Sequence, residues 1–162
     1  MIYSQWCAAQ GEVTVAPDAF PAFETVDLNG NTVTHEIFYD KDLTVVNIWG
    51  TYCSPCIDEM PELAEWSESM PENMQLIGLI SDLYSADDAE TLELAQAICE
   101  ATGADVYTSL VASEDFTDLL YGIVGVPTTF FVDRNGTIVG DPIVGANVAG
   151  CKAAAEKLLS GM

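Results

Sequence analysis

Two cysteines separated by two residues are the part of this sequence best suited to chemistry. Cys53 and Cys56 stand in the segment Trp49-Gly-Thr-Tyr-Cys-Ser-Pro-Cys56, where a helix is expected to begin. Free backbone N–H groups and the helix dipole favour negative charge at such a position, so they lower the pKa of a thiol there. The thiolate is the form that attacks a disulfide. We therefore predict that Cys53 is the nucleophile that forms a mixed disulfide and that Cys56 resolves it.

The same spacing has two plainer interpretations. A purely structural disulfide is disfavoured, because a disulfide that closes so short a loop stabilises a fold least. A zinc site would need a second pair of ligands, and the sequence contains one CxxC pair and a single histidine, His35. We therefore predict redox exchange at Cys53 and Cys56, with no metal ion and no other cofactor.

The elements around this pair follow from the pattern of apolar residues. Leu43–Trp49 is rich in β-branched residues and is typical of a central strand buried on both faces. A helix is expected from about Cys53 to Met70. The rest of the chain predicts strands at Leu76–Ser81 and Val106–Val111 and helices at Asp87–Thr102, Ser113–Tyr121 and Ala149–Ser160.

Asn-Gly pairs at two places predict β-hairpins. Asn29-Gly30-Asn31 interrupts an extended segment that runs from Phe20 to Thr34. Asp133-Arg-Asn-Gly136 lies between predicted strands at Thr128–Val132 and Thr137–Val144. The order of strands, helices and hairpins implies an α/β protein with a mixed central sheet covered on both faces.

Length and composition limit the organisation and the partners. The 162 residues fit one domain, which we place at residues 17–162 after a flexible leader at residues 1–16. The 26 acidic and 4 basic residues give a net charge of -22, which repels nucleic acids and anionic lipid headgroups. No signal peptide is recognisable. We expect either a cytoplasmic protein or a chain shown without its export segment.

Residues 17–160 resemble the thioredoxin superfamily, and more narrowly the TlpA/ResA-like group of bacterial disulfide reductases. The resemblance rests on the CxxC segment, Glu59-Met-Pro61, Val126-Pro-Thr-Thr-Phe-Phe-Val-Asp133 and Asn135-Gly136. It implies a thioredoxin fold, a three-layer α/β/α sandwich with a central mixed sheet and an added N-terminal β-hairpin. Asn47 stands where typical thioredoxins carry a buried aspartate, and an asparagine there is ordinary in the TlpA-like group.

The resemblance also implies how a substrate binds. The backbone of Val126, beside a cis Pro127, would pair with an extended segment of the substrate by strand addition. Trp49 and Tyr52 would frame the nucleophile, and packing in the core is the alternative for both aromatic side chains.

Glu59 matches a glutamate that tunes the active-site thiols in ResA-like proteins. On a helix it lies one turn after Cys56, from where it can accept or relay a proton. With so many carboxylates in the sequence, a plain solvated Glu59 remains an open alternative.

By the same resemblance, the protein is an exported, membrane-anchored reductase of protein disulfides and a monomer. Its substrates would be apocytochromes c or other exported proteins, and a membrane or thioredoxin-type donor would supply electrons. The direction of exchange depends on a reduction potential that the sequence does not provide.

Three other functions fit the sequence less well. A thioredoxin-like peroxidase would need an arginine to polarise peroxide, and the only arginine, Arg134, lies in a predicted hairpin turn. A Sco-like copper-binding protein would need CxxxC and a well-placed histidine. A non-catalytic interaction module is disfavoured by the intact CxxC pair and by Pro127.

The remaining cysteines have plain interpretations. Cys99 lies on the apolar face of its predicted helix and fits a small core residue, as does Cys151, while Cys7 falls in the leader. A Cys99–Cys151 disulfide is conceivable, but the thioredoxin fold normally puts those two helices on opposite faces of the sheet.

Overall fold

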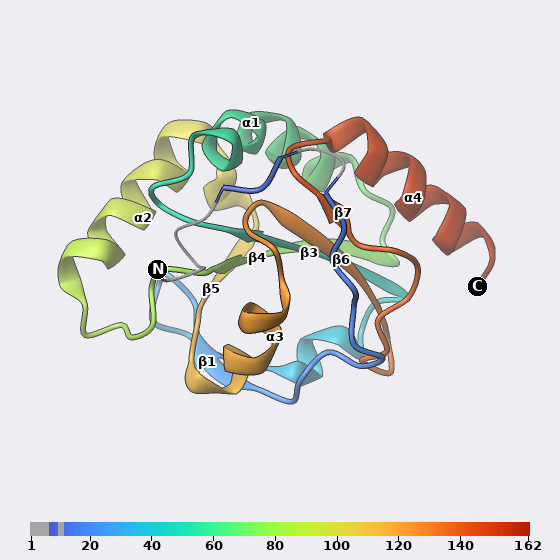
Figure 1. Ribbon diagram of the computed structural model, residues 1–162, viewed down its shortest axis with the longest axis horizontal. Coiled ribbons are helices and arrows are strands. Elements are labelled where there is room, and N and C mark those ends of the chain that lie inside the picture. Colours follow the sequence, from blue (N-terminus) through green and yellow to red (C-terminus); the bar gives the residue numbers. More distant parts are fainter. Residues whose placement is uncertain (1–6, 10–11) are drawn as a thin grey trace.

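A five-stranded mixed sheet with helices on both faces forms the centre of the computed structural model, which describes residues 7–9 and 12–162 (Figure 1). The strands stand in the order β5-β4-β3-β6-β7, with β4 and β5 parallel to β3 and with β6 antiparallel to it. Their bounds are Leu43–Trp49 for β3, Met74–Ile80 for β4, Thr108–Val111 for β5, Thr128–Asp133 for β6 and Ile143–Val144 for β7. The predicted fold class is confirmed.

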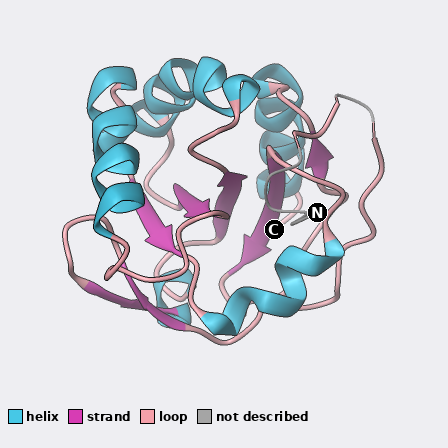
Figure 2. Ribbon diagram, turned by 60° about the vertical axis from the view of Figure 1, so that its left-hand side comes forward, coloured by secondary structure: helices cyan, strands magenta, loops and turns pink. Residues whose placement is uncertain are grey.

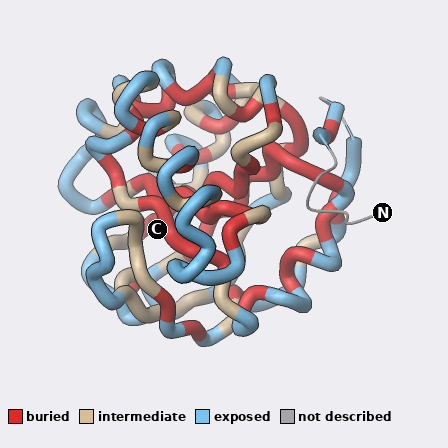
Figure 3. The backbone as a smooth tube through the Cα atoms, turned by 90° about the vertical axis from the view of Figure 1, so that its left-hand side faces the viewer, coloured by how far each residue is buried: buried red, intermediate tan, exposed pale blue. Residues whose placement is uncertain are grey.

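The middle strand, β3, is buried along its whole length. Its run of apolar residues suits a strand with a hydrophobic layer on each face. Figure 3 shows the buried stretches of the backbone gathered in the interior, with exposed segments around them. The strand that precedes the CxxC pair is therefore the most enclosed element of the fold.

Three helices lie on one face of the sheet: α1 (Ser54–Ser69), α2 (Ala89–Thr102) and α4 (Val148–Ser160). Helix α1 crosses from β3 to β4 and α2 from β4 to β5, so both crossovers progress in one direction across the sheet. Right-handed crossovers in one direction place their helices on the same face. The other face is covered by α3 (Thr117–Gly122), a 3-10 turn at His35–Phe38 and the N-terminal hairpin (Figure 1).

The expectation that α2 and α4 lie on opposite faces is wrong. Figures 1 and 2 show both on the same side of the sheet, and α1 packs against each of them. The physical reason is the handedness of the α2 crossover, because β5 lies beyond β4. Cys99 and Cys151 are both buried and free, so no disulfide joins the two helices.

The N-terminal hairpin forms as predicted, from β1 (Glu24–Val26) and β2 (Thr32–Thr34). Gly30 at its turn has a φ of 84°, a conformation that glycine adopts without a steric penalty. The hairpin packs on the sheet beside β5, where the Thr25 hydroxyl donates a hydrogen bond of 2.6 Å to the carbonyl of Val111.

The second predicted hairpin is correct in its turn and wrong in its second strand. The carboxylate of Asp133 accepts hydrogen bonds from the backbone at Asn135 and Thr137, which closes the turn. Residues 137–144 do not form one strand, because a left-handed Gly140 and a proline at 142, which lacks an N–H, interrupt it. The chain rejoins the sheet at Ile143–Val144.

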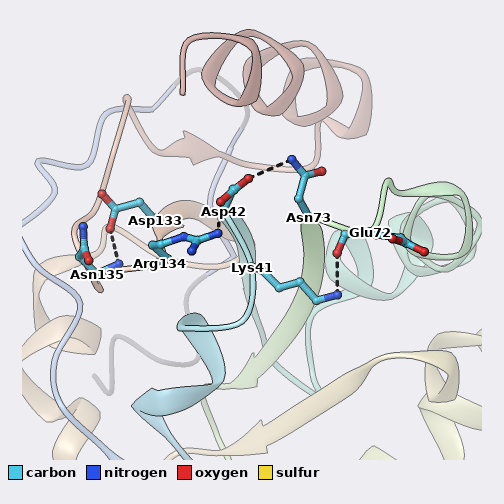
Figure 4. A network of polar contacts seen from close by, with 7 residues as sticks. All are labelled: Lys41, Asp42, Glu72, Asn73, Asp133, Arg134 and Asn135. Atoms are coloured by element: carbon cyan, nitrogen blue, oxygen red, sulfur yellow. Dashed lines mark hydrogen bonds and ion pairs between the residues drawn. The ribbon is translucent and has the colours of Figure 1, made fainter.

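Polar residues, exposed or partly buried, surround the start of β3 (Figure 4). Asp42 forms an ion pair with Arg134 and accepts a hydrogen bond of 3.1 Å from the side-chain amide of Asn73. Lys41 donates to the backbone carbonyl of Glu72 at 2.7 Å. Two of the four basic residues of the chain therefore lie at this end of the sheet, and the CxxC pair follows the other end.

Candidate functional site

The turn between β3 and α1 holds the first cysteine in place. A Cβ atom on Gly50 would lie 2.5 Å from Cε1 of Tyr52, so a larger residue there would force that ring to move. The Gly50 carbonyl accepts a hydrogen bond of 3.1 Å from the backbone N–H of Cys53. Thr51 is fixed by Asp82, whose carboxylate accepts both its backbone N–H, at 3.0 Å, and its hydroxyl.

Cys53 caps the N-terminus of α1. Its Sγ accepts a hydrogen bond of 3.3 Å from the backbone N–H of Cys56. Pro55 fits this first turn because no intrahelical acceptor is available for its missing N–H. Cys53 and Cys56 are joined as a disulfide, with 5.3 Å between their Cα atoms, and neither has exposed surface. The prediction that the pair begins a helix is confirmed.

The segment before β6 lies beside this pair. The peptide bond between Val126 and Pro127 is cis, and both residues are buried. The Val126 carbonyl oxygen lies 3.6 Å from Sγ of Cys53. The same oxygen accepts a hydrogen bond of 2.6 Å from the backbone N–H of Ala8. Cys7 forms a β-bridge with Val126, so an extended segment already pairs with the backbone at this point.

Glu59 lies inside the protein, only 7% exposed, on the face of α1 that covers β3. Its Oε2 accepts a hydrogen bond of 3.1 Å from the side-chain amide of Asn47. Burial raises the pKa of Glu59 to about 7, and hydrogen bonds from Asn47 and from the backbone of Asn147 oppose that rise. The solvated alternative is therefore wrong, and Glu59 is a buried carboxyl that titrates near neutrality.

Asn47 links this carboxyl to two residues on other elements. Besides Glu59, its amide donates to the hydroxyl of Thr129 on β6, at 3.2 Å. Burial raises the pKa of Cys151, on α4, to about 12, and a hydrogen bond with Thr129 partly offsets this effect. The sequence alone assigned Thr129 no role and assigned Cys151 only that of a small core residue. The available signal was the single amide, Asn47, in an otherwise apolar or hydroxyl-bearing strand.

The two aromatic residues of the motif take different positions. Trp49 has no exposed surface, and its indole lies in the core near Gly78 and Ser109. Tyr52 is half-buried beside the pair, and burial raises the pKa of its hydroxyl. The position of Trp49 fits core packing. Contact of either residue with a substrate remains a prediction.

The side chain of His35 packs on the face of the sheet opposite α1, α2 and α4, beside the N-terminal hairpin. Its Nδ1 lies 3.3 Å from the backbone nitrogen of Phe23, and its ring packs edge-on against Phe23 and Tyr39. Within residues 7–9 and 12–162, no three His, Cys, Asp or Glu side chains are grouped so that they could hold a metal ion. The same residues contain no helix with the length and apolar character needed to cross a bilayer.

Comparison with known families agrees with the fold and the paired cysteines. The model of the Redoxin family matches residues 16–158. The chain belongs to the Redoxin family, and within the thioredoxin superfamily it is a TlpA/ResA-like member. It is a thiol-disulfide oxidoreductase.

Individual relatives are distant in sequence but similar in fold. The thiol-disulfide oxidoreductase ResA of Bacillus cereus is 22% identical over 142 residues, which cover 85% of this chain and 75% of ResA. A DsbF homologue from Corynebacterium diphtheriae is 20% identical, with a TM-score of 0.69 and 94% of both chains covered. The exposed lipoprotein thioredoxin Etrx1 of Streptococcus pneumoniae is also 20% identical, with a TM-score of 0.63. The alignment with Etrx1 covers 86% of this chain and 98% of Etrx1.

Proposed function

We propose that this protein reduces disulfide bonds in other proteins outside the cytoplasm. The observation that carries the proposal is the position of Sγ of Cys53. It accepts the N–H of Cys56 at the start of α1 and lies 3.6 Å from the carbonyl of Val126, whose backbone is paired with an extended segment. A polypeptide bound there by strand addition would bring its own disulfide to the nucleophile.

The reaction begins with the reduced pair. The Cys53 thiolate attacks one sulfur of the substrate disulfide, and the other substrate sulfur leaves as a thiolate that takes up a proton. Cys56 then loses its proton and attacks Sγ of Cys53, which releases the second substrate sulfur. The substrate gains two electrons, and the protein is left with the Cys53–Cys56 disulfide seen in the structure. A membrane or thioredoxin-type donor would restore the dithiol.

Glu59 is suited to receive the proton that Cys56 loses. It follows Cys56 by three residues on α1, so the two side chains lie on the same face of the helix. A base works best when its pKa is close to the working pH, and burial brings the pKa of Glu59 to about 7. Asn47 holds the carboxylate by a hydrogen bond.

Val126, Pro127 and Tyr52 would form the surface that a substrate meets. Protein substrates suit a site that offers backbone groups and an aromatic ring, and apocytochromes c or other exported proteins are candidates. Nucleic acid is a poor partner for a chain with a net charge of -22. We further propose that the protein acts as a monomer, anchored to a membrane in its full-length form. The fold that it shares with an exposed lipoprotein of Streptococcus pneumoniae supports that location.

No specific observation favours the two alternative enzymatic or binding roles. Arg134 would have to polarise peroxide in a peroxidase, but it forms an ion pair with Asp42 before the start of β3. Cys53 follows the end of the same seven-residue strand, which separates the two by roughly 20 Å. A Sco-like copper site would need His35, but the ring of this residue packs against Phe23 beside the N-terminal hairpin.

Reduction of insulin by the full chain, with dithiothreitol as electron donor, tests the proposal. We expect Cys53→Ser to abolish turnover and Cys56→Ser to accumulate a mixed disulfide with insulin, visible by mass spectrometry. Cys99→Ala, which removes a thiol away from the motif, should leave turnover unchanged. Turnover by Cys53→Ser at the wild-type rate would refute the assignment of the nucleophile.

A further inference from the structure

The segment that pairs with Val126 belongs to the chain itself. Ala8 is buried and donates its backbone N–H to the Val126 carbonyl at 2.6 Å, and Cys7 forms the β-bridge with the same residue. The segment is also held further along, where the Thr14 hydroxyl accepts the N–H of Val124 at 3.3 Å. Cys7, Ala8 and Thr14 therefore contact the loop that leads to Pro127 at two points.

This arrangement occupies the position where a substrate strand would bind. The Val126 carbonyl has a short hydrogen bond from Ala8, and it lies 3.6 Å from Sγ of Cys53. Cys53 itself has no exposed surface in this arrangement. A disulfide from another protein can reach its sulfur only after something over the pair moves, and the segment at Val126 is paired where that protein would dock.

The residue placed opposite Val126 is a cysteine. Cys7 is free and exposed, so its thiol is available for exchange. Tyr52 precedes Cys53, and burial raises the pKa of its hydroxyl, with the charge of Cys7 as the second cause. The thiol of Cys7 is thus close enough to the motif for its charge to act there.

We propose that the segment around Cys7 is an internal substrate of the Cys53–Cys56 pair: it fills the substrate strand position, and Cys7 exchanges with the disulfide. The Cys7 thiolate attacks Sγ of Cys53, a Cys7–Cys53 bond forms, the Cys53–Cys56 bond breaks, and Cys56 leaves as a thiolate. One thiol proton is released and one can be taken up, so no oxidant or reductant is consumed. The proposal rests on the substrate position described above at Val126.

Trapping tests the exchange without any foreign substrate. Cys56→Ser is oxidised with oxidised glutathione, digested with a glutamate-specific protease and mapped by mass spectrometry. Cleavage at the many glutamates, among them Glu59, separates Cys53 from Cys99. We expect a Cys7–Cys53 disulfide within a monomer, absent when Cys7→Ser is added. Capture of Cys53 by Cys99 or Cys151, a Cys7-linked dimer, or Cys53 joined only to glutathione would overturn the exchange.

A backbone variant tests whether the segment around Cys7 occupies the position of a substrate strand. Ala8→Pro removes the N–H that bonds Val126 and leaves Cys7 intact, whereas Ala9→Pro leaves that N–H in place. At insulin concentrations below KM, we expect Ala8→Pro to be roughly two- to ten-fold faster than the wild type, the population shift that loss of one hydrogen bond produces. Ala9→Pro should match the wild type. An Ala8→Pro variant that is equally fast or slower would show that the segment does not compete with substrates.

The two tests separate this inference from the proposed function. Trapping of Cys7 by Cys53 does not require reduction of another protein, so it can succeed if insulin is not a substrate. Conversely, insulin reduction that depends on Cys53, without any Cys7–Cys53 bond, would keep the proposed function and reject the internal substrate.

Discussion

The two ends of β3 are built from different kinds of interaction. Before the strand, Asp42 and Arg134 form an ion pair whose side chains are 34% and 56% exposed. After it, Cys53 has no exposed surface and its sulfur accepts a backbone N–H. Solvent-exposed ion pairs contribute little to the stability of a fold. A buried polar group that loses its hydrogen-bond partner, in contrast, destabilises the fold strongly. We therefore expect changes at the buried end to alter stability and exchange, and changes at the exposed end to alter neither.

The largest effect is expected at Glu59, as a pH dependence of stability. Its pKa is about 7 in the fold against an ordinary value of 4.5 for a glutamate, so the folded state binds more protons between these values. The stability that this group contributes is therefore present below about pH 4.5 and lost as the pH rises through 7, a loss of about 3 kcal/mol. Glu59→Gln should exceed the wild type by up to that amount at pH 8 and match it near pH 4.

Urea unfolding of the oxidised protein at the two pH values measures this difference. Glu65→Gln is the matched control, because Glu65 is exposed and lies on the same helix as Glu59. If Glu59→Gln raises the free energy of unfolding by the same amount at both pH values, the burial of this carboxyl is not coupled to its protonation.

An intermediate effect is expected at the turn after β3. Asp82→Ala removes both hydrogen bonds that fix Thr51, at a cost of about 1–3 kcal/mol. The loop before Cys53 should then be less well held, so kcat/KM for insulin falls. Asp82→Asn keeps one acceptor oxygen and should retain most of both properties. If Asp82→Ala loses stability but keeps the wild-type kcat/KM, Asp82 supports the fold without positioning the nucleophile.

The smallest effect is expected at the exposed end of β3. Arg134→Ala removes the ion pair with Asp42, and we expect no measurable change in Tm or in insulin reduction. Thermal unfolding and the insulin assay on the same preparation check both. A marked loss of exchange in Arg134→Ala would break the comparison and would direct attention back to a peroxidase, in which this arginine has a chemical role.

The elements that the sequence predicted well depend on local patterns. The apolar run of β3, the break at Gly50 and the cap at Cys53 lie within eleven residues, so they specify the strand, turn and helix start directly. The N-terminal hairpin likewise follows from a glycine with positive φ at Gly30. The strand expected at 137–144 is reduced to Ile143–Val144, because a left-handed glycine at 140 and a proline at 142 interrupt it.

The contacts that sequence reasoning missed join residues far apart in the chain. Asn47 forms a hydrogen bond with Thr129, which lies 82 positions further along the chain, and Thr51 forms one with Asp82, 31 positions further along. The shared face of α2 and α4 follows from where β5 joins the sheet, which no local pattern records. The pairing of Cys7 with Val126 likewise spans most of the chain, and it places a residue assigned to the leader at the reacting pair.

The sequence by itself determined which atoms can react. Two cysteines at a helix start and a proline before a strand are local features, and caps and turns act over a few residues. Only the tertiary structure decided the state of those atoms. It buries Glu59 under Asn47, so its carboxyl titrates near neutrality, and it pairs the chain's own segment with Val126 beside Cys53. Burial and pairing depend on neighbours brought together by the fold, and spacing along the chain does not specify them.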